Sequence, residues 1–126
     1  LQYIYHELYS IEREKDIIYY CFYENLVNDI NMLPQVLFLA GFDPVLLAYK
    51  NKSRYIDVVH TKQVFLRNGF IKNVLLMHGR VIGVWRVYKN VLEIYSFLKL
   101  SSEEKNSIKY NAIQSAYLNF NKITIL

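Results

Sequence analysis

The sequence predicts an α+β fold in which a curled, mostly antiparallel sheet, or a partly open β-barrel, carries a packed C-terminal helix. Aromatic residues make up 16% of the 126-residue chain, with 12 Tyr and 7 Phe, and such residues favour strands. Two-residue turn signals separate apolar runs in the second half, and a helix-capping signal follows them. The length fits a single domain over residues 1–126.

The first elements are predicted from short apolar runs. Residues 2–11 and 17–23 are dense in Tyr and Ile and predict two strands, with the charged residues 12–16 as an exposed loop between them. Residues 24–31 carry apolar side chains at helical spacing and predict a short helix that ends near Pro34.

The next two elements lie on either side of a break in the apolar pattern that contains Gly41 and Pro44. Residues 35–40 are continuously apolar, which predicts a strand buried on both faces. Residues 41–44 interrupt it, and we expect Asp43 to accept hydrogen bonds from nearby backbone N–H groups rather than to act as a general base. Residues 57–67 predict a short helix with Asp57 as its N-cap.

Residues 71–98 predict a three-stranded meander. Its strands cover residues 74–77, 80–88 and 91–98, and they are joined by the two-residue turns His78-Gly79 and Lys89-Asn90.

Alternation within residues 80–88 predicts which side chains share a face. It places Trp85 with Val81 and Gly83, and it places Arg86 on the opposite face. Gly83 inside this strand predicts a bulge or a close backbone approach.

A C-terminal helix and a final strand complete the prediction. The sequence Ser101-Ser102-Glu103-Glu104 is a capping box, which predicts that a helix begins there. Residues 122–126 predict a closing strand. The apolar helix face is predicted from six positions: Ile108, Ala112, Ile113, Ala116, Tyr117 and Phe120.

Several classes of protein are disfavoured. The single cysteine, Cys21, forms no internal disulfide, and with no secretory leader in view it favours the cytoplasm. No apolar run approaches the roughly 20 residues that cross a bilayer. The three histidines and Cys21 lack metal-site spacing, and the four glycines do not form a phosphate loop. We therefore expect no metal and no cofactor.

Positive charge is concentrated in the middle of the chain. Residues 31–99 contain ten Lys or Arg and three acidic residues, while residues 1–30 are net acidic. Basic side chains interleaved with aromatic ones are typical of surfaces that hold a nucleic-acid backbone. The alternative is that Trp85 is a core residue and the charges are ordinary surface residues. The candidate phosphate-binding residues are Lys72, Arg80, Arg86 and Lys89, with Lys50, Lys52 and Arg54 as a second cluster.

Two segments resemble a known family. Leu39-Ala40-Gly41-Phe42-Asp43-Pro44 begins the first, and Gly79-Arg80-Val81-Ile82-Gly83-Val84-Trp85-Arg86 ends the second. Together they resemble the C-terminal part of the bacterial winged-helix DNA-binding domain family, which includes DNA glycosylases that unhook interstrand crosslinks. The resemblance covers roughly residues 37–120, although Asn51-Lys52 stands where the family usually has Asp-Arg.

The resemblance implies a β-barrel-like C-terminal fragment of a longer protein, preceded by tandem winged helices. The leading hypothesis is a module that contacts duplex DNA phosphates and supports those upstream domains. One alternative is the structural part of a DNA glycosylase acting on alkylated or crosslinked DNA, and another is an interaction domain that does not touch DNA. No catalytic residue carries over, because the family's catalytic motif contains glutamine and this chain's glutamines are isolated: Gln2, Gln35, Gln63 and Gln114.

Overall fold

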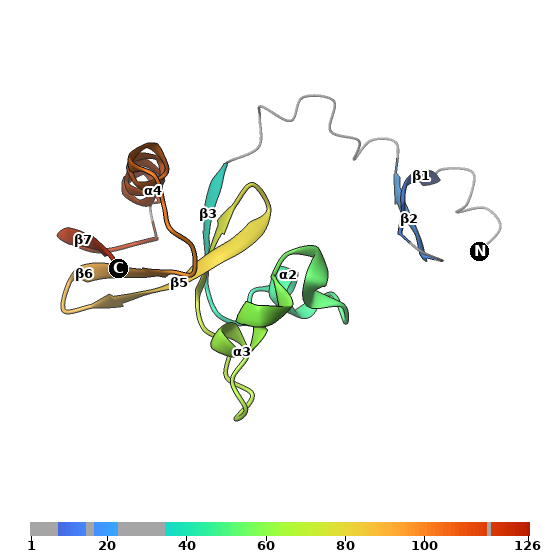
Figure 1. Cartoon of the computed structure of the whole chain (residues 1–126), viewed down its shortest axis with the longest axis horizontal. Helices are drawn as coiled ribbons and strands as arrows, with labels where there is room; N and C mark the ends of the chain where they lie inside the picture. Colours follow the sequence, from blue (N-terminus) through green and yellow to red (C-terminus); the bar gives the residue numbers. More distant parts are fainter. Residues whose placement is uncertain (1–7, 15–16, 23–34, 116) are drawn as a thin grey trace. The chain divides into compact units, whose positions relative to one another are not determined.

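The computed structural model describes residues 8–14, 17–22, 35–115 and 117–126. The chain divides into two compact units, Leu1–Leu33 and Pro34–Leu126. Figure 1 shows the elements of both units along the chain.

The first unit contains an antiparallel hairpin. Its strands are β1 (Leu8–Glu14) and β2 (Ile17–Phe22), paired from Leu8–Phe22 to Glu14–Ile17. The two predicted strands are confirmed where they are described, but the expectation of a loop from residue 12 onward is wrong. Pairing continues to Glu14, which lies opposite Ile17. The helix expected over residues 24–31 lies outside the described residues.

The second unit is a five-stranded sheet in the order β3-β4-β5-β6-β7. Neighbouring strands are antiparallel except for β6 and β7, which are parallel. The α+β class with a curled sheet is confirmed. The sheet is not a barrel, however, because β3 and β7 are its two edges and do not pair with each other. The strands are β3 (Val36–Leu39), β4 (Val74–Met77), β5 (Arg80–Tyr88), β6 (Val91–Ser96) and β7 (Lys122–Ile125).

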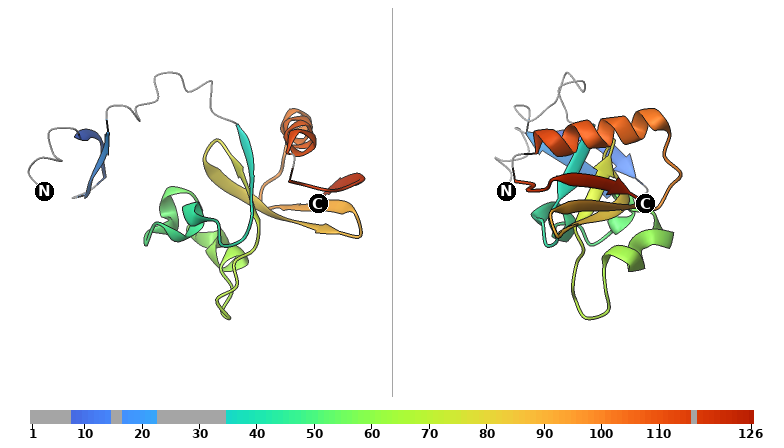
Figure 2. Two further views of the ribbon diagram at one scale, coloured as in Figure 1. Left: turned by 180° about the vertical axis from the view of Figure 1, so that it is seen from behind. Right: turned by 90° about the vertical axis from the view of Figure 1, so that its left-hand side faces the viewer.

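Both faces of the sheet are covered, as Figures 1 and 2 show. Helix α4 (Ser102–Gln114) packs on one face, where Ile108 and Ala112 join a buried cluster with Phe38 and Trp85. The segment between β3 and β4 covers the other face, where Leu46, Ile56 and Val64 are fully buried. This segment contains α2 (Pro44–Leu47), η3 (Lys52–Arg54), η4 (Val58–His60) and α3 (Thr61–Val64).

A β-bulge in β5 changes which side chains share a face. Leu75 pairs with Gly83 and Leu76 pairs with Val81, so one extra residue of β5 lies between these pairs. Trp85 therefore joins the cluster under α4, whereas Val81 joins the opposite cluster. The predicted common face of Val81 and Trp85 is wrong for this reason.

The bulge and close approach predicted at Gly83 are confirmed. A Cβ atom at this position would lie 2.5 Å from the backbone oxygen of Tyr95 on β6. Glycine is therefore required for β5 and β6 to approach each other here.

The strand at residues 35–40 is confirmed as β3, but its burial differs from the prediction. Leu37 is 40% exposed, because β3 is an edge strand and only one of its faces is fully covered. Asp43 is the N-cap of α2 and accepts a 2.9 Å hydrogen bond from Val45 N, as expected. The helix expected over residues 57–67 is present only as the short η4 and α3, which end at Val64, and the Asp57 cap is confirmed.

The predicted turns of the meander are also confirmed. His78 and Gly79 have positive φ angles of 49° and 76°, and Lys89 and Asn90 have φ angles of 48° and 61°. Such turns match the twist of antiparallel strands.

The capping box at Ser101 is confirmed, but the helix face is only partly as expected. Ile113 is 68% exposed, and the helix ends at Gln114, so the predicted face does not continue to Phe120. At its end, the Ser115 hydroxyl donates to Asn111 O, a local bond that competes with further helix. Ala116 lies outside the described residues. The predicted closing strand is present as β7, but it pairs only with β6 and does not close the sheet.

Candidate nucleic-acid interface

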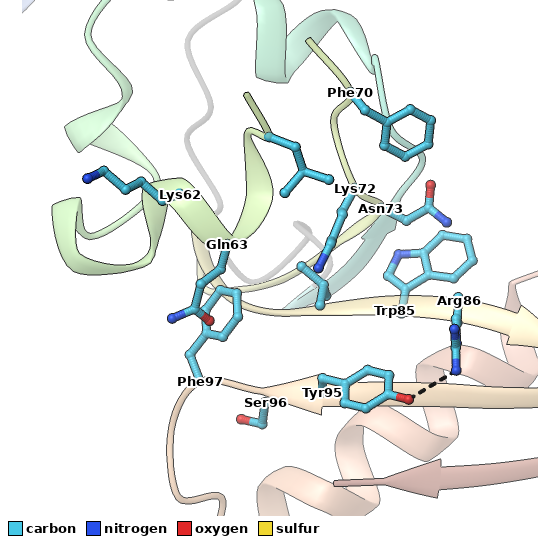
Figure 3. Close-up of a pocket in the computed structure, with 12 residues that line it drawn as sticks. Lys62, Gln63, Phe70, Lys72, Asn73, Trp85, Arg86, Tyr95, Ser96 and Phe97 are labelled. Carbon is cyan, nitrogen blue, oxygen red and sulfur yellow. Dashed lines mark hydrogen bonds between the residues drawn. The ribbon is translucent and has the colours of Figure 1, made fainter. Parts of the chain in front are cut away.

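A pocket of about 680 Å³ lies between α3, the loop that follows it, and the β5–β6 pair (Figure 3). Three of its lining residues are cationic and none is acidic. Its charged and polar lining consists of Lys62, Lys72, Arg86, Gln63, Asn73 and Ser96, and its apolar and aromatic lining of Leu66, Phe70, Val84, Trp85, Tyr95 and Phe97.

Trp85 forms a fixed wall of this pocket. Its Nε1 group donates to Leu39 O at 3.2 Å and to Val74 O at 3.0 Å, and its ring meets Phe38 edge-on. The residue is only 9% exposed, so the alternative that placed Trp85 in the core is confirmed. Trp85 thus shapes the pocket without offering a free ring face.

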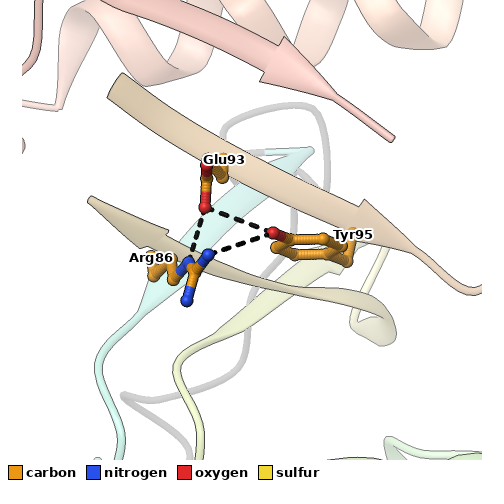
Figure 4. Close-up of polar contacts among 3 residues, drawn as sticks. All are labelled: Arg86, Glu93 and Tyr95. Atoms are coloured by element: carbon orange, nitrogen blue, oxygen red, sulfur yellow. Dashed lines mark hydrogen bonds and ion pairs between the residues drawn. The ribbon is translucent and has the colours of Figure 1, made fainter. Parts of the chain in front are cut away.

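Arg86 is held at the pocket by residues of β6 (Figure 4). Its Nε donates to Glu93 Oε2 at 2.5 Å, and its Nη2 donates to the Tyr95 hydroxyl at 3.3 Å. The Tyr95 hydroxyl in turn donates to Glu93 Oε2 at 3.2 Å. The hydrogen bond from Arg86 lowers the pKa of Glu93, and the same bond raises the pKa of Arg86. The charge of Arg86 is therefore already balanced by one carboxylate.

The two lysines of the pocket are not balanced in this way. Lys62 and Lys72 are exposed and form no ion pair within the described part of the chain. Lys72 extends from the loop after α3 toward the centre of the pocket in Figure 3. The Lys62 side chain extends away from the other lining residues in Figure 3, so Lys72 is the unpaired cation that raises the local potential in the concavity and attracts anions.

The polar and aromatic lining is fixed by contacts outside the pocket. Asn73 Oδ1 accepts a 2.7 Å hydrogen bond from Gly41 N, which sets the orientation of its amide. The Phe70 ring meets Phe42 edge-on at 5.8 Å, and the Phe97 ring stacks on His60 at 4.5 Å. These contacts hold the side chains in place before any ligand arrives.

The seven predicted basic residues fall into two groups. The hairpin group is Lys50, Lys52, Arg54 and Arg80, in which Arg80 links the start of β5 to η3. The pocket group is Lys72 and Arg86, which line the pocket, together with Lys89, which is not one of its lining residues. Both Arg86 and Lys89 lie over the ring of Tyr88, at 5.4 Å and 5.3 Å.

Several members of the hairpin group have structural contacts. Arg80 Nη1 donates to Ser53 O at 2.9 Å and to Arg54 O at 3.2 Å, so it ties η3 to the start of β5. Lys52 Nζ donates to Leu46 O at 2.5 Å. The Arg54 guanidinium lies 5.5 Å from the centre of the Tyr49 ring. Lys50 is exposed between α2 and η3.

Sequence reasoning missed Lys62, Gln63, Asn73 and Tyr95 as pocket residues. Phe70 and Trp85 are among the aromatic residues interleaved with the basic ones in the sequence, and both line the pocket. The helical prediction over residues 57–67 included Lys62 but contained no signal that it would lie near β5. The segment between β3 and β4 folds back so that α3 packs against β5, and this places Lys62 near β5.

No group of three or more His, Cys, Asp or Glu side chains in the described residues is placed to hold a metal ion. None of the described helices has the length and apolar character needed to cross a membrane.

Comparison with known proteins gives one family and one solved structure. The profile of the family described as DNA glycosylase AlkZ-like matches residues 12–114. The structure of the Streptomyces sahachiroi DNA glycosylase AlkZ matches with a TM-score of 0.67 and 19% identity, over 95% of this chain. That match covers 34% of the glycosylase, so this chain spans about a third of its length. No curated protein matches the chain significantly.

Proposed function

The chain belongs to the AlkZ-like DNA glycosylase family, and on this premise we propose that it is the DNA-holding, structural part of a DNA-repair glycosylase. In this proposal the intact protein excises bases from alkylated or crosslinked DNA. Winged-helix domains upstream in the same protein supply the catalytic residues, and residues 1–126 form a C-terminal portion that holds the DNA duplex. The intact protein acts in the cytoplasm.

The observation that carries the proposal is the family match over residues 12–114, which includes all of residues 31–99, the basic segment. Two groups of cations on this segment support it: the hairpin group and the pocket group. Contacts to phosphates from Lys and Arg position a protein on DNA without reading its sequence. We therefore propose Lys50, Lys52, Arg54, Lys72, Arg80 and Lys89 as phosphate-contacting residues, and Arg86 as one that contacts a phosphate only weakly while Glu93 balances its charge.

The acidic residues of the basic segment support a holding role rather than a catalytic one. Asp43 caps α2, and Glu93 is paired with Arg86 and Tyr95. Asp57 caps η4. A general base needs a carboxylate free to accept a proton from substrate or water. Each of these carboxylates instead has a structural partner.

DNA binding is tested by titrating a labelled random duplex against the chain at several salt concentrations. The affinity should fall as salt rises, and Lys72→Gln should make the slope of log K against log salt shallower by about 0.9. Lys109→Gln is the matched control, because Lys109 is exposed on α4, which packs on the opposite face of the sheet. An affinity that does not change with salt would rule out the phosphate contacts.

The interaction-domain alternative makes the opposite prediction. Charge reversal at Arg80 and Arg86 should weaken DNA binding by the intact protein if these residues meet phosphates. Unchanged DNA binding would favour a domain that only packs against its neighbours. Base release from alkylated or crosslinked DNA by the intact protein tests the glycosylase activity itself.

A further inference from the structure

We propose that the pocket between α3 and the β5–β6 pair binds a single unpaired nucleotide of a DNA strand, with Lys72 meeting its phosphate and Tyr95 and Phe70 meeting its base. This inference rests on the proposed function, because it assumes that DNA lies against the basic segment. The inference adds a binding site for one nucleotide, which the proposed phosphate contacts along a duplex do not need.

The charge of the pocket favours an anion. Lys62 and Lys72 have no ion-pair partner in the described residues, and the pocket lining contains no carboxylate. Arg86 is neutralised by Glu93, so Lys72 is the cation that points into the pocket with its charge available (Figure 3). A walled concavity lined by one sign of charge concentrates the electric field and selects a ligand of the opposite sign.

The aromatic residues favour a planar ligand. Phe70 is 53% exposed and Tyr95 is 36% exposed, so both offer ring surface to a ligand, unlike the buried Trp85. Arg86 lies 5.9 Å from the centre of the Tyr95 ring and adds a cation beside it. Combinations of basic and aromatic side chains hold unpaired bases by stacking, without reading the sequence.

The amide groups supply hydrogen bonds at the edge of such a ligand. The Asn73 oxygen is occupied by Gly41 N, which leaves its NH₂ group as a donor. Gln63 lies on the opposite side of the pocket in Figure 3. An unpaired base has free donors and acceptors on its Watson–Crick edge that these groups can satisfy.

The shape of the pocket favours an unpaired nucleotide over a duplex. Ring faces inside a duplex are covered by neighbouring bases, so exposed aromatic side chains can stack only on a base that has left the helix. The volume of about 680 Å³ is within the range of sites that enclose small organic ligands. The lining contains no carboxylate that could act as a general base, which fits a holding role.

The test uses the whole chain and two duplexes of the same sequence, one fully paired and one with a single bulged nucleotide. We expect wild type to bind the bulged duplex about tenfold more tightly than the paired one. Phe70→Ala should remove most of this preference and leave paired-duplex binding unchanged. Tyr110→Ala is the matched control, since Tyr110 is also an exposed aromatic residue but lies on α4 and does not line the pocket.

Fluorescence of 2-aminopurine at the bulge reports directly on stacking and should be quenched by wild type but not by Phe70→Ala. Equal affinity for the two duplexes, or loss of preference in Tyr110→Ala as well, would overturn the inference. Saturable binding of free deoxyadenosine monophosphate without a preference for the bulge would overturn the assignment to a DNA strand. Salt-dependent binding of the paired duplex is read separately, so the proposed function stands or fails on its own result.

Discussion

Replacing Glu93 by Gln should strengthen DNA binding by releasing Arg86. The carboxylate of Glu93 accepts a 2.5 Å hydrogen bond from Arg86 Nε and balances its charge. Gln has nearly the same shape but no charge, so in the variant the guanidinium is free to meet a phosphate. The Tyr95 hydroxyl still contacts Arg86 and keeps it at the pocket.

The expected size follows from counterion release. One added phosphate contact makes the slope of log K against log salt steeper by about 0.9. A rise in salt of about fourfold should then weaken the variant about 3.5 times more than it weakens wild type. At low salt the variant should bind more tightly than wild type.

Fluorescence anisotropy of a labelled duplex over a series of salt concentrations measures both quantities. Glu103→Gln is the matched control, because Glu103 is exposed in the first turn of α4, on the helix that covers the other face of the sheet. An unchanged slope in Glu93→Gln, or the same change in Glu103→Gln, would refute the reasoning.

Three other predictions concern the fold and its pH dependence. Gly83→Ala should lower the free energy of unfolding in urea by about 1–3 kcal/mol, since the new Cβ would lie 2.5 Å from a backbone oxygen. Gly69→Ala is the comparison variant: its Cβ would meet no atom within 4 Å, although Gly69 has a φ angle of +79°, so its cost should be smaller. Ser101→Ala should cost about 1 kcal/mol by the same assay, because it removes the cap of α4; a change near zero would mean that the capping box contributes nothing. The Arg86–Glu93 pair is intact above the lowered pKa of Glu93 and is lost as the pH falls through it, so the NMR signal of Arg86 Nε–H should titrate in wild type and not in Glu93→Gln.

The elements of the second unit that depend on sequence neighbours were predictable. The turn residues at 78–79 and 89–90, the caps at Asp43 and Asp57, and the capping box at Ser101 all form as expected. Each depends on bonds or φ angles within a few residues. The sequence also contained a signal for the pairing of Arg86 with Glu93. A two-residue turn at Lys89-Asn90 sets the register of β5 against β6 and so places Arg86 opposite Glu93.

Most of the errors depend on contacts between distant segments. Alternation along β5 failed because a bulge at its pairing with β4 shifts the faces. The predicted helix face failed because Ile113 is exposed within α4 and because α4 ends at Gln114, before Tyr117 and Phe120. The barrel expectation failed because the chain leaves β3 and β7 as separate edges. None of these follows from periodicity alone.

By itself the amino-acid sequence determined the α+β class, the order of the meander and the C-terminal helix, and the concentration of positive charge in residues 31–99. Only the tertiary structure decided which cations are available. It ties Arg80 to the carbonyls of η3, pairs Arg86 with Glu93, and brings Lys62 and Lys72 to one pocket with Tyr95. The physical reason is range: turns and caps form between neighbours in the chain, whereas a pocket and its charge balance depend on side chains that meet only when distant segments pack together.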